Sequence, residues 1–189
     1  MILRELREPL IIILQDAAEA EVYLDDNLGS QFARRTYIRS IFAAIEGTLW
    51  LLKTACLAGK SSKGVRVFNP AEFALLKEES YDLKSNGEVK VSSKFLKLPD
   101  NIKFVFKYIN KRVTVATDIG VGGKHWEEFL LALEVRNRIT HPKNASAFTI
   151  KDEEIELCRR TSHWFNDISY GAIKALFRLD KDEQKSPAD

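Results

Sequence analysis

An arginine, an asparagine and a histidine near the end of one helical pattern are the residues of this sequence best suited to chemistry. Residues 134–143 read Glu-Val-Arg-Asn-Arg-Ile-Thr-His-Pro-Lys, which brings Arg136, Asn137 and His141 within six positions. Arginine offers a permanently charged fork that matches a phosphate, and histidine can move a proton near neutral pH. Asparagine can orient a reacting group or a water molecule. The trio suits metal-free attack of a ribose 2′-hydroxyl on its own phosphodiester, because it lacks the carboxylates and thiolates that hold a divalent metal.

Helical spacing predicts where these side chains lie. The apolar stripe of this helix consists of Trp126, Phe129, Leu130 and Leu133. Steps of three and four residues along the stripe arrive next at Arg136 and Asn137, which we therefore expect on the inward face. Charged residues rarely lie there unless they are paired or functional. We expect Glu134 and Arg138 to point toward solvent. His141 should lie just beyond the helix, which Pro142 ends, and fold back beside Arg136.

This arrangement, Arg136-Asn137-x-x-x-His141 at the C-terminal end of a bundle helix, resembles the HEPN superfamily. The signature of that family is an arginine, four to six residues, and then a histidine, often with a polar residue after the arginine. Residues 40–50 read Ser-Ile-Phe-Ala-Ala-Ile-Glu-Gly-Thr-Leu-Trp, which is similar to HEPN helices that carry a glutamate, here Glu46, in an apolar context. The resemblance covers roughly residues 10–58 and 124–180.

The resemblance implies a function and a role for each residue. Many HEPN proteins are metal-independent endoribonucleases that act as toxins or in antiviral defence and leave a 2′,3′-cyclic phosphate and a 5′-hydroxyl. His141 would then transfer protons, Arg136 would hold the scissile phosphate, and Asn137 would position one of these groups. Glu46 would support the site by pairing with Arg136. Two copies of the motif would face each other in a homodimer, with RNA as substrate and with neither a cofactor nor a metal.

The same residues allow other interpretations. Arg136 and His141 can form a purely structural network in a non-catalytic HEPN-like module that binds RNA, a nucleotide or a protein partner. The chain can also be a toxin that an antitoxin protein silences. Glu46 can be an ordinary half-exposed helix glutamate. Dimerisation has one further indication, since residues 10–14 are more apolar all round than a surface helix requires.

Composition narrows the class of protein. The chain has 189 residues, of which 45% are hydrophobic and 30% charged, as expected of a globular domain. Its two cysteines, Cys56 and Cys158, lie in helical patterns and lack the spacing of a zinc site or a disulfide framework, so we expect a reduced, cytoplasmic protein. The apolar run at 10–14 is too short to span a bilayer, and we expect no membrane association.

The charge is distributed unevenly along the chain. The formal net charge is +2, yet residues 57–116 hold 12 Lys/Arg against 6 Asp/Glu, and the other residues hold 17 against 21. Basic residues interleaved with aromatic ones suit a track for single-stranded RNA. The alternative is that the aromatic side chains belong to the core and the lysines form a solvated face. The aromatic residues of this segment are Phe68, Phe73, Tyr81, Phe95, Phe104, Phe106 and Tyr108.

The periodicities predict an all-α fold, an antiparallel four-helix bundle with an inserted short helix and a small β-hairpin. The four long helices are expected at about 9–26, 30–58, 125–140 and 150–179. We expect one HEPN-like domain over residues 1–180, with a basic insertion at about 59–116 and a flexible tail at 181–189. Within the insertion, residues 59–66 are expected to form a polar loop.

Several local signals predict where elements begin. Asn69-Pro70-Ala71-Glu72 has the form of a capping box, and Asn86-Gly87 between alternating apolar residues predicts a hairpin over 80–93. Gly47, in the middle of a helix, predicts a close approach of two helices.

Other helix starts are predicted from single residues. Pro9 is expected as the first residue of its helix, Ser30 as a cap and Asp100 as another cap. Thr149 with Asp152 should form a second capping box.

Overall fold

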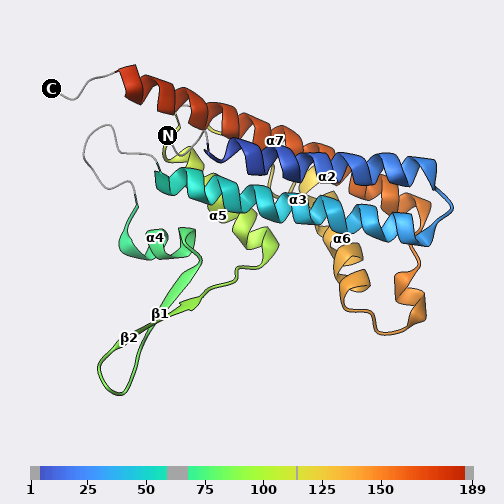
Figure 1. Cartoon of the computed structure of the whole chain (residues 1–189), viewed down its shortest axis with the longest axis horizontal. Coiled ribbons are helices and arrows are strands. Elements are labelled where there is room, and N and C mark those ends of the chain that lie inside the picture. Colours follow the sequence, from blue (N-terminus) through green and yellow to red (C-terminus); the bar gives the residue numbers. More distant parts are fainter. Residues whose placement is uncertain (1–4, 59–67, 114, 186–189) are drawn as a thin grey trace. The chain divides into compact units, whose positions relative to one another are not determined.

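The computed structural model describes residues 5–58, 68–113 and 115–185 (Figure 1). It is mostly helical, with six α-helices and one two-stranded antiparallel hairpin, which confirms the all-α bundle with a small β-hairpin that the sequence predicts. The elements, in chain order, are α2 (Arg7–Asp26), α3 (Gln31–Ala58), α4 (Pro70–Leu76), β1 (Glu79–Leu83), β2 (Val89–Ser93), α5 (Leu98–Asn110), α6 (Lys124–Thr140), the short 3₁₀ helix η1 (Ala145–Phe148) and α7 (Asp152–Lys185).

The chain forms two compact units, which we describe separately. The four-helix unit consists of Arg7–Thr48 and Asp118–Gly171, and so contains α2, α6 and the N-terminal parts of α3 and α7. The hairpin unit contains the ends of α3 and α7 together with α4, β1, β2 and α5.

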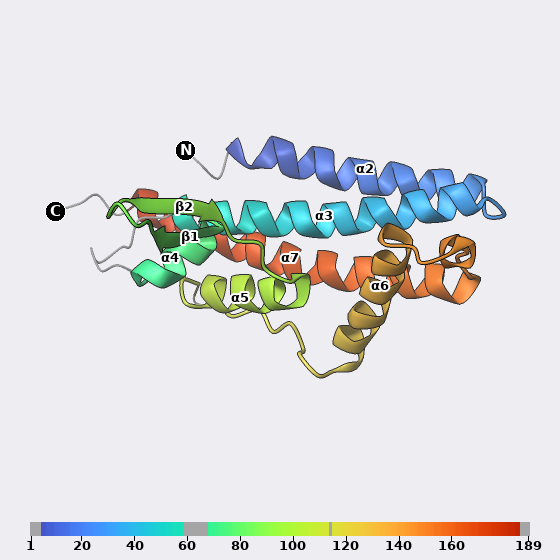
Figure 2. The ribbon, with the colours of Figure 1, turned by 90° about the horizontal axis from the view of Figure 1, so that it is seen from below.

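In the four-helix unit, α2 and α3 form a helical hairpin and run alongside each other in both views (Figures 1 and 2). A Cβ atom at Gly47 would lie 2.9 Å from Cδ1 of Ile13, which confirms the predicted close approach at this glycine. The hydroxyl of Ser30 accepts a hydrogen bond of 3.3 Å from the N–H of Ala33, so Ser30 caps α3 as predicted. Helix α2 begins at Arg7, which makes Pro9 its third residue rather than its first. Proline is tolerated there because first-turn N–H groups have no intrahelical partner.

Helix α3 is the most deeply buried element. Its apolar residues at helical spacing are each at most 2% exposed: Tyr37, Ile38, Ile41, Ile45, Leu49, Leu52 and Cys56. By length and composition alone this helix is apolar enough to cross a membrane, and 56% of its most apolar stretch is buried inside the structure. Core helices of soluble proteins meet the same criterion.

Helices α6 and α7 pack through an aromatic cluster in the four-helix unit. The ring centroids of Trp126 and Phe129 on α6 lie 6.2 Å and 5.6 Å from that of Trp164 on α7. Pro142 follows the end of α6 as predicted, and η1 comes next. The capping box predicted for Thr149 and Asp152 is wrong, because Thr149 ends η1 instead.

The start of α7 and the hydrogen bonds of its first backbone N–H groups differ from the prediction. Its first residue is Asp152 rather than Ile150, and the Glu154 carboxylate accepts a hydrogen bond of 3.0 Å from the N–H of Lys151. The side chain of Ile150 is buried, so the chain must turn into the core before the helix can begin. At the other end, α7 continues to Lys185, five residues into the segment expected to be a tail.

In the hairpin unit, the capping box of α4 is confirmed. Asn69 Oδ1 accepts from the N–H of Glu72 at 2.9 Å, and the Glu72 carboxylate accepts from the N–H of Asn69 at 3.0 Å. The hairpin also forms as predicted, with Tyr81 opposite Val91 and Leu83 opposite Val89. The polar loop predicted at 59–66 lies outside the described residues.

Helix α5 starts earlier than its sequence predicts. It begins at Leu98 with Lys97 as N-cap, so Asp100 lies inside the first turn and is not the cap. Pro99 explains the difference, since proline is well placed in the first turn of a helix. The buried residues of α5 are Ile102, Val105, Phe106, Tyr108 and Ile109.

Candidate functional site

The buried face of α6 does not lead to Arg136 and Asn137, so this part of the sequence prediction is wrong. Its buried residues are Trp126, Phe129, Ala132, Val135 and Ile139. From Trp126 to Val135 the buried residues follow one another in steps of three, which moves the buried stripe around the helix and away from Arg136 and Asn137. The packing of the neighbouring helices, and not the α6 sequence, decides whether the buried residues follow in steps of three or of four. Asn137 is exposed, and the Arg136 side chain lies at the edge of the buried face with 25% of its surface exposed.

The pairing predicted between Arg136 and Glu46 is present. Nη2 of Arg136 donates to Oε1 of Glu46 in an ion pair between α6 and α3. Nη1 of the same guanidinium donates to Oδ1 of Asn137 at 3.0 Å. The guanidinium carbon lies 5.8 Å from the ring centroid of Phe42, one turn before Glu46 on α3. Phe42 and Glu46 thus fix Arg136 at one edge of the α3–α6 contact.

His141 lies at the C-terminal end of α6 and is exposed. Its backbone N–H donates to the carbonyl oxygen of Asn137 at 2.9 Å. Within the described residues, no hydrogen bond or ion pair joins its side chain to Arg136, whose polar partners are Glu46 and Asn137, so the fold-back stays a prediction. At φ −122° and ψ 63°, His141 has left the helical conformation, as the following Pro142 requires.

Arginines of α3 hold the end of α6 and the chain that follows it. Nη2 of Arg39 donates to the carbonyl oxygen of Ile139 at 3.4 Å, two residues before His141. Nη1 of Arg35 donates to the carbonyl oxygen of Phe148 at 3.0 Å, and its guanidinium lies over the Phe148 ring. Sequence reasoning missed these residues. The available signal was a group of arginines at the start of an otherwise apolar helix.

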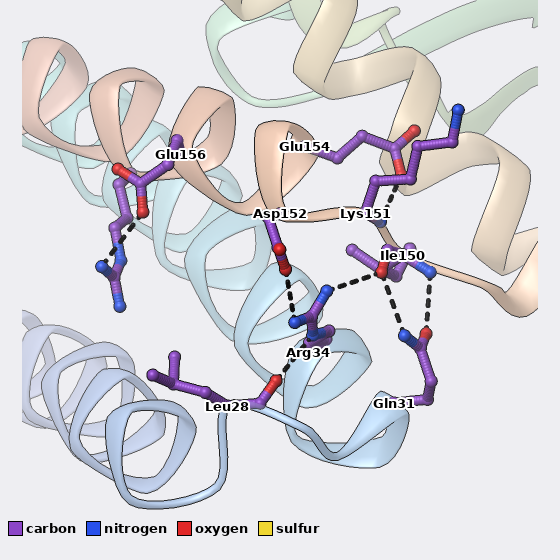
Figure 3. Close-up of polar contacts among 9 residues, drawn as sticks. Leu28, Gln31, Arg34, Ile150, Lys151, Asp152, Glu154 and Glu156 are labelled. Atoms are coloured by element: carbon purple, nitrogen blue, oxygen red, sulfur yellow. Dashed lines mark hydrogen bonds and ion pairs between the residues drawn. The ribbon is translucent and has the colours of Figure 1, made fainter.

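Arg34 and Gln31 attach the start of α7 to α3 (Figure 3). The Arg34 guanidinium donates to the carbonyl oxygens of Leu28 at 2.8 Å and Ile150 at 2.9 Å, and forms an ion pair with Asp152 at 2.5 Å. The Gln31 amide binds both the N–H and the carbonyl oxygen of Ile150, at 2.7 Å and 3.0 Å. These contacts fix the α7 end of the segment between α6 and α7, whereas Arg39 holds its α6 end.

Arg138 differs from its predicted solvated position. Its Nη2 donates to Oε1 of Glu154 on α7 at 2.7 Å, and both side chains are partly buried. Glu134 is exposed as predicted. Of these two arginines on α6, which are two positions apart, Arg136 binds α3 and Arg138 binds α7, since they leave the helix in different directions.

The described residues contain neither a cluster that could hold a metal ion nor a reactive cysteine. Residues 5–58, 68–113 and 115–185 contain no group of three or more His, Cys, Asp or Glu side chains able to hold a metal ion. Burial raises the pKa of the Cys56 thiol to about 11 and that of the Cys158 thiol to about 12. Both thiols therefore stay protonated near neutral pH and are poor nucleophiles.

No protein-family model matches this chain, and neither the curated proteins nor the solved structures give a match.

Proposed function

We propose that this chain is a metal-independent endoribonuclease of the HEPN type, toxin-like or defence-related, with Arg136, Asn137 and His141 as its catalytic residues. The observation that carries the proposal is the position of Arg136. Its guanidinium is held by Glu46 and Asn137, while a quarter of the side chain stays exposed at the same helix end as His141. A fixed cation near an exposed imidazole is the minimum that metal-free phosphodiester cleavage needs.

The guanidinium keeps hydrogen-bond donors for a phosphate. Arginine has five N–H donors, and two of them bind Glu46 and Asn137. The remaining donors can bind the oxygens of a phosphodiester, whose charge increases as it becomes a pentacovalent phosphorane. Glu46 acts as a positioning residue, since it restricts the rotamer of Arg136 without reaching the substrate itself.

The reaction would proceed by transfer within the RNA strand. The ribose O2′ forms a bond to phosphorus as its proton passes to a base, and the bond from phosphorus to O5′ breaks as that oxygen receives a proton. One imidazole can take up or supply a proton, but it cannot start in both protonation states at once. A homodimer in which two motifs face each other would supply His141 twice, and would make RNA the shared substrate.

A second candidate function is a non-catalytic HEPN-like module that binds RNA, a nucleotide or a protein partner. Two observations favour it. Arg136 already has an anionic partner in Glu46, and within the described residues no hydrogen bond or ion pair joins its guanidinium to His141. We also propose that the protein is cytoplasmic and does not act at a membrane. In the toxin interpretation, an antitoxin protein would silence it.

Cleavage of RNA by the purified chain in EDTA tests the function. We expect wild-type protein to cleave and His141→Ala and Arg136→Ala to lose at least about a hundredfold of that rate. His163→Ala is the matched control, because His163 is also an exposed histidine of the four-helix unit but lies outside the motif. The products should end in a 2′,3′-cyclic phosphate and a 5′-hydroxyl.

Two results would contradict the proposal. Equal cleavage by the wild type and both motif variants would assign the activity to a contaminant or another site. Binding of RNA without cleavage, at the same affinity in His141→Ala, would favour the non-catalytic module.

A further inference from the structure

The β-hairpin exposes an apolar face that nothing in the described structure covers. Tyr81, Leu83, Val89 and Val91 are 53%, 77%, 63% and 55% exposed, and we call these four residues the hairpin apolar face. They form two directly opposed pairs, Tyr81 with Val91 and Leu83 with Val89, so they lie on the same side of the sheet. Contiguous exposed apolar residues on a sheet mark a surface for a binding partner.

The outer edge of β2 is open at the same residues. Lys84 N–H donates to Glu88 at 2.9 Å and Lys94 N–H donates to Glu78 at 2.6 Å, which places the even-numbered residues in the hydrogen-bonded pairs of the ladder. The N–H and carbonyl groups of Val89, Val91 and Ser93 therefore point away from β1. Only β1 pairs with β2 in the described sheet, so these groups are free to bind a third strand.

The opposite face of β2 presents two lysines. Lys90 lies within β2, Lys94 directly follows the strand on the same face, and neither forms an ion pair within the described part of the chain, although Asp82 is directly opposite Lys90. Lys84, which directly follows β1, forms an ion pair with Glu88 at 3.0 Å. A strand added to β2 would thus meet apolar side chains on one face and two cations on the other.

We propose that the β2 edge binds an extended segment of another protein in which apolar and acidic residues alternate. The segment adds a third strand to the hairpin, places its apolar side chains beside Val89 and Val91, and places its carboxylates beside Lys90 and Lys94. Cross-strand pairs of this kind each stabilise a sheet modestly, and backbone hydrogen bonds supply the remaining affinity. This surface lies in the hairpin unit, and the inference is independent of the proposed ribonuclease function.

A second copy of this chain is disfavoured as the partner. Symmetric pairing of two β2 edges would align odd-numbered residues with odd-numbered ones, and so would bring Lys90 and Lys94 of both copies onto one face. Like charges on neighbouring strands destabilise a sheet. Single-stranded RNA is disfavoured as well, because Tyr81 is the only one of the four residues of the hairpin apolar face with a ring on which a base can stack.

The test uses the full chain and two synthetic peptides of about six residues, one alternating valine with glutamate and the other valine with lysine. In amide NMR, we expect the acidic peptide to shift the Val89, Val91 and Ser93 signals and to slow their hydrogen exchange. The Lys90 and Ser92 amides, already bonded to β1, should gain little protection. Lys90→Glu should weaken the binding of the acidic peptide roughly fivefold and strengthen the binding of the basic one.

Lys107→Glu on α5 is the matched control. Lys107 is also exposed and forms no ion pair within the described residues, and its substitution changes the net charge by the same amount as Lys90→Glu. Its effect on the acidic peptide should be small. The proposal is overturned if neither peptide binds, if both bind equally, or if the two charge reversals weaken binding to the same extent. A footprint of an oligouridylate, rather than of the acidic peptide, on Val89–Ser93 would assign the edge to RNA.

Discussion

At the scale of single residues, the four-helix unit fixes one cation in a defined orientation. Arg136 is fixed by an ion pair, a neighbouring amide and an aromatic ring, and all three partners come from α3 or from α6 itself. The sequence predicted the partner Glu46 correctly, because Glu46 is an acidic residue in an otherwise apolar helix. It did not predict that Asn137 would be exposed, since the neighbouring helices decide which face of α6 is buried.

Glu46→Gln tests the positioning role of Glu46. Glutamine keeps an oxygen that accepts a hydrogen bond but removes the charge, so Arg136 should sample more rotamers. We expect the rate of RNA cleavage to fall roughly tenfold to a hundredfold, chiefly in kcat. The free energy of unfolding should fall by less than about 1 kcal/mol, because the pair is partly solvated. Kinetics and urea titration measure the two effects.

Glu134→Gln is the control for that change. Glu134 is exposed on α6 and has no ion pair within the described residues, so both cleavage and stability should stay unchanged. An equal loss of cleavage in Glu46→Gln and Glu134→Gln would show that charge alone matters, and not the orientation of Arg136.

At the scale of elements, the boundaries that depend on local hydrogen bonds were predicted best. Ser30 caps α3, and Asn69 with Glu72 forms the capping box of α4, because each needs only residues three positions apart. Thr149 and Asp152 have the same spacing but form no box. There the burial of Ile150, bound to Gln31 of α3, overrides the local preference.

Gly47 tests the contact between α2 and α3. Alanine at this position gains about 1 kcal/mol of helix propensity, but its Cβ would lie 2.9 Å from the flexible end of Ile13. We expect Gly47→Ala to change stability by less than about 1 kcal/mol, and Gly47→Val to destabilise by roughly 2 kcal/mol. In an Ile13→Ala background, Gly47→Ala should stabilise by about 1 kcal/mol. Urea denaturation measures each value.

The matched control is Ala18→Val on the exposed side of α2, which should cost only about 0.5 kcal/mol. If Gly47→Val costs no more than Ala18→Val, the two helices do not approach closely at Gly47.

At the scale of the whole molecule, polar contacts between distant parts of the sequence decide how the segment between α6 and α7 is held. Arg34 lies 116 residues from Ile150, yet its guanidinium binds that carbonyl oxygen as well as Leu28 and Asp152 (Figure 3). One side chain thus joins the turn before α3 to the start of α7. No local sequence pattern predicts a contact over such a separation.

Arg34→Ala should destabilise the protein by roughly 3 kcal/mol, because charge-assisted hydrogen bonds to two backbone carbonyls are lost together. Thermal and urea unfolding measure this loss. Arg34→Lys should recover part of the stability, since it keeps the charge but not the planar fork.

Asp152→Asn distinguishes the contribution of the Arg34–Asp152 ion pair to stability from that of the Arg34 hydrogen bonds to the carbonyl oxygens. The Asp152 side chain is 83% exposed, so removing its charge should cost less than about 1 kcal/mol. A loss as large as that of Arg34→Ala would mean that the ion pair, and not the carbonyl contacts, fixes this segment.

The sequence by itself determined the helical class, the hairpin and its turn, and the capping box of α4. These features follow from periodicity and from contacts over a few residues, where one residue type has one good solution. Only the tertiary structure decided that the buried face of α6 runs through Val135 and Ile139, that Arg138 binds Glu154, and that the hairpin leaves its apolar face exposed. Periodicity shows that an apolar face exists, but the packing of other elements decides whether anything covers it.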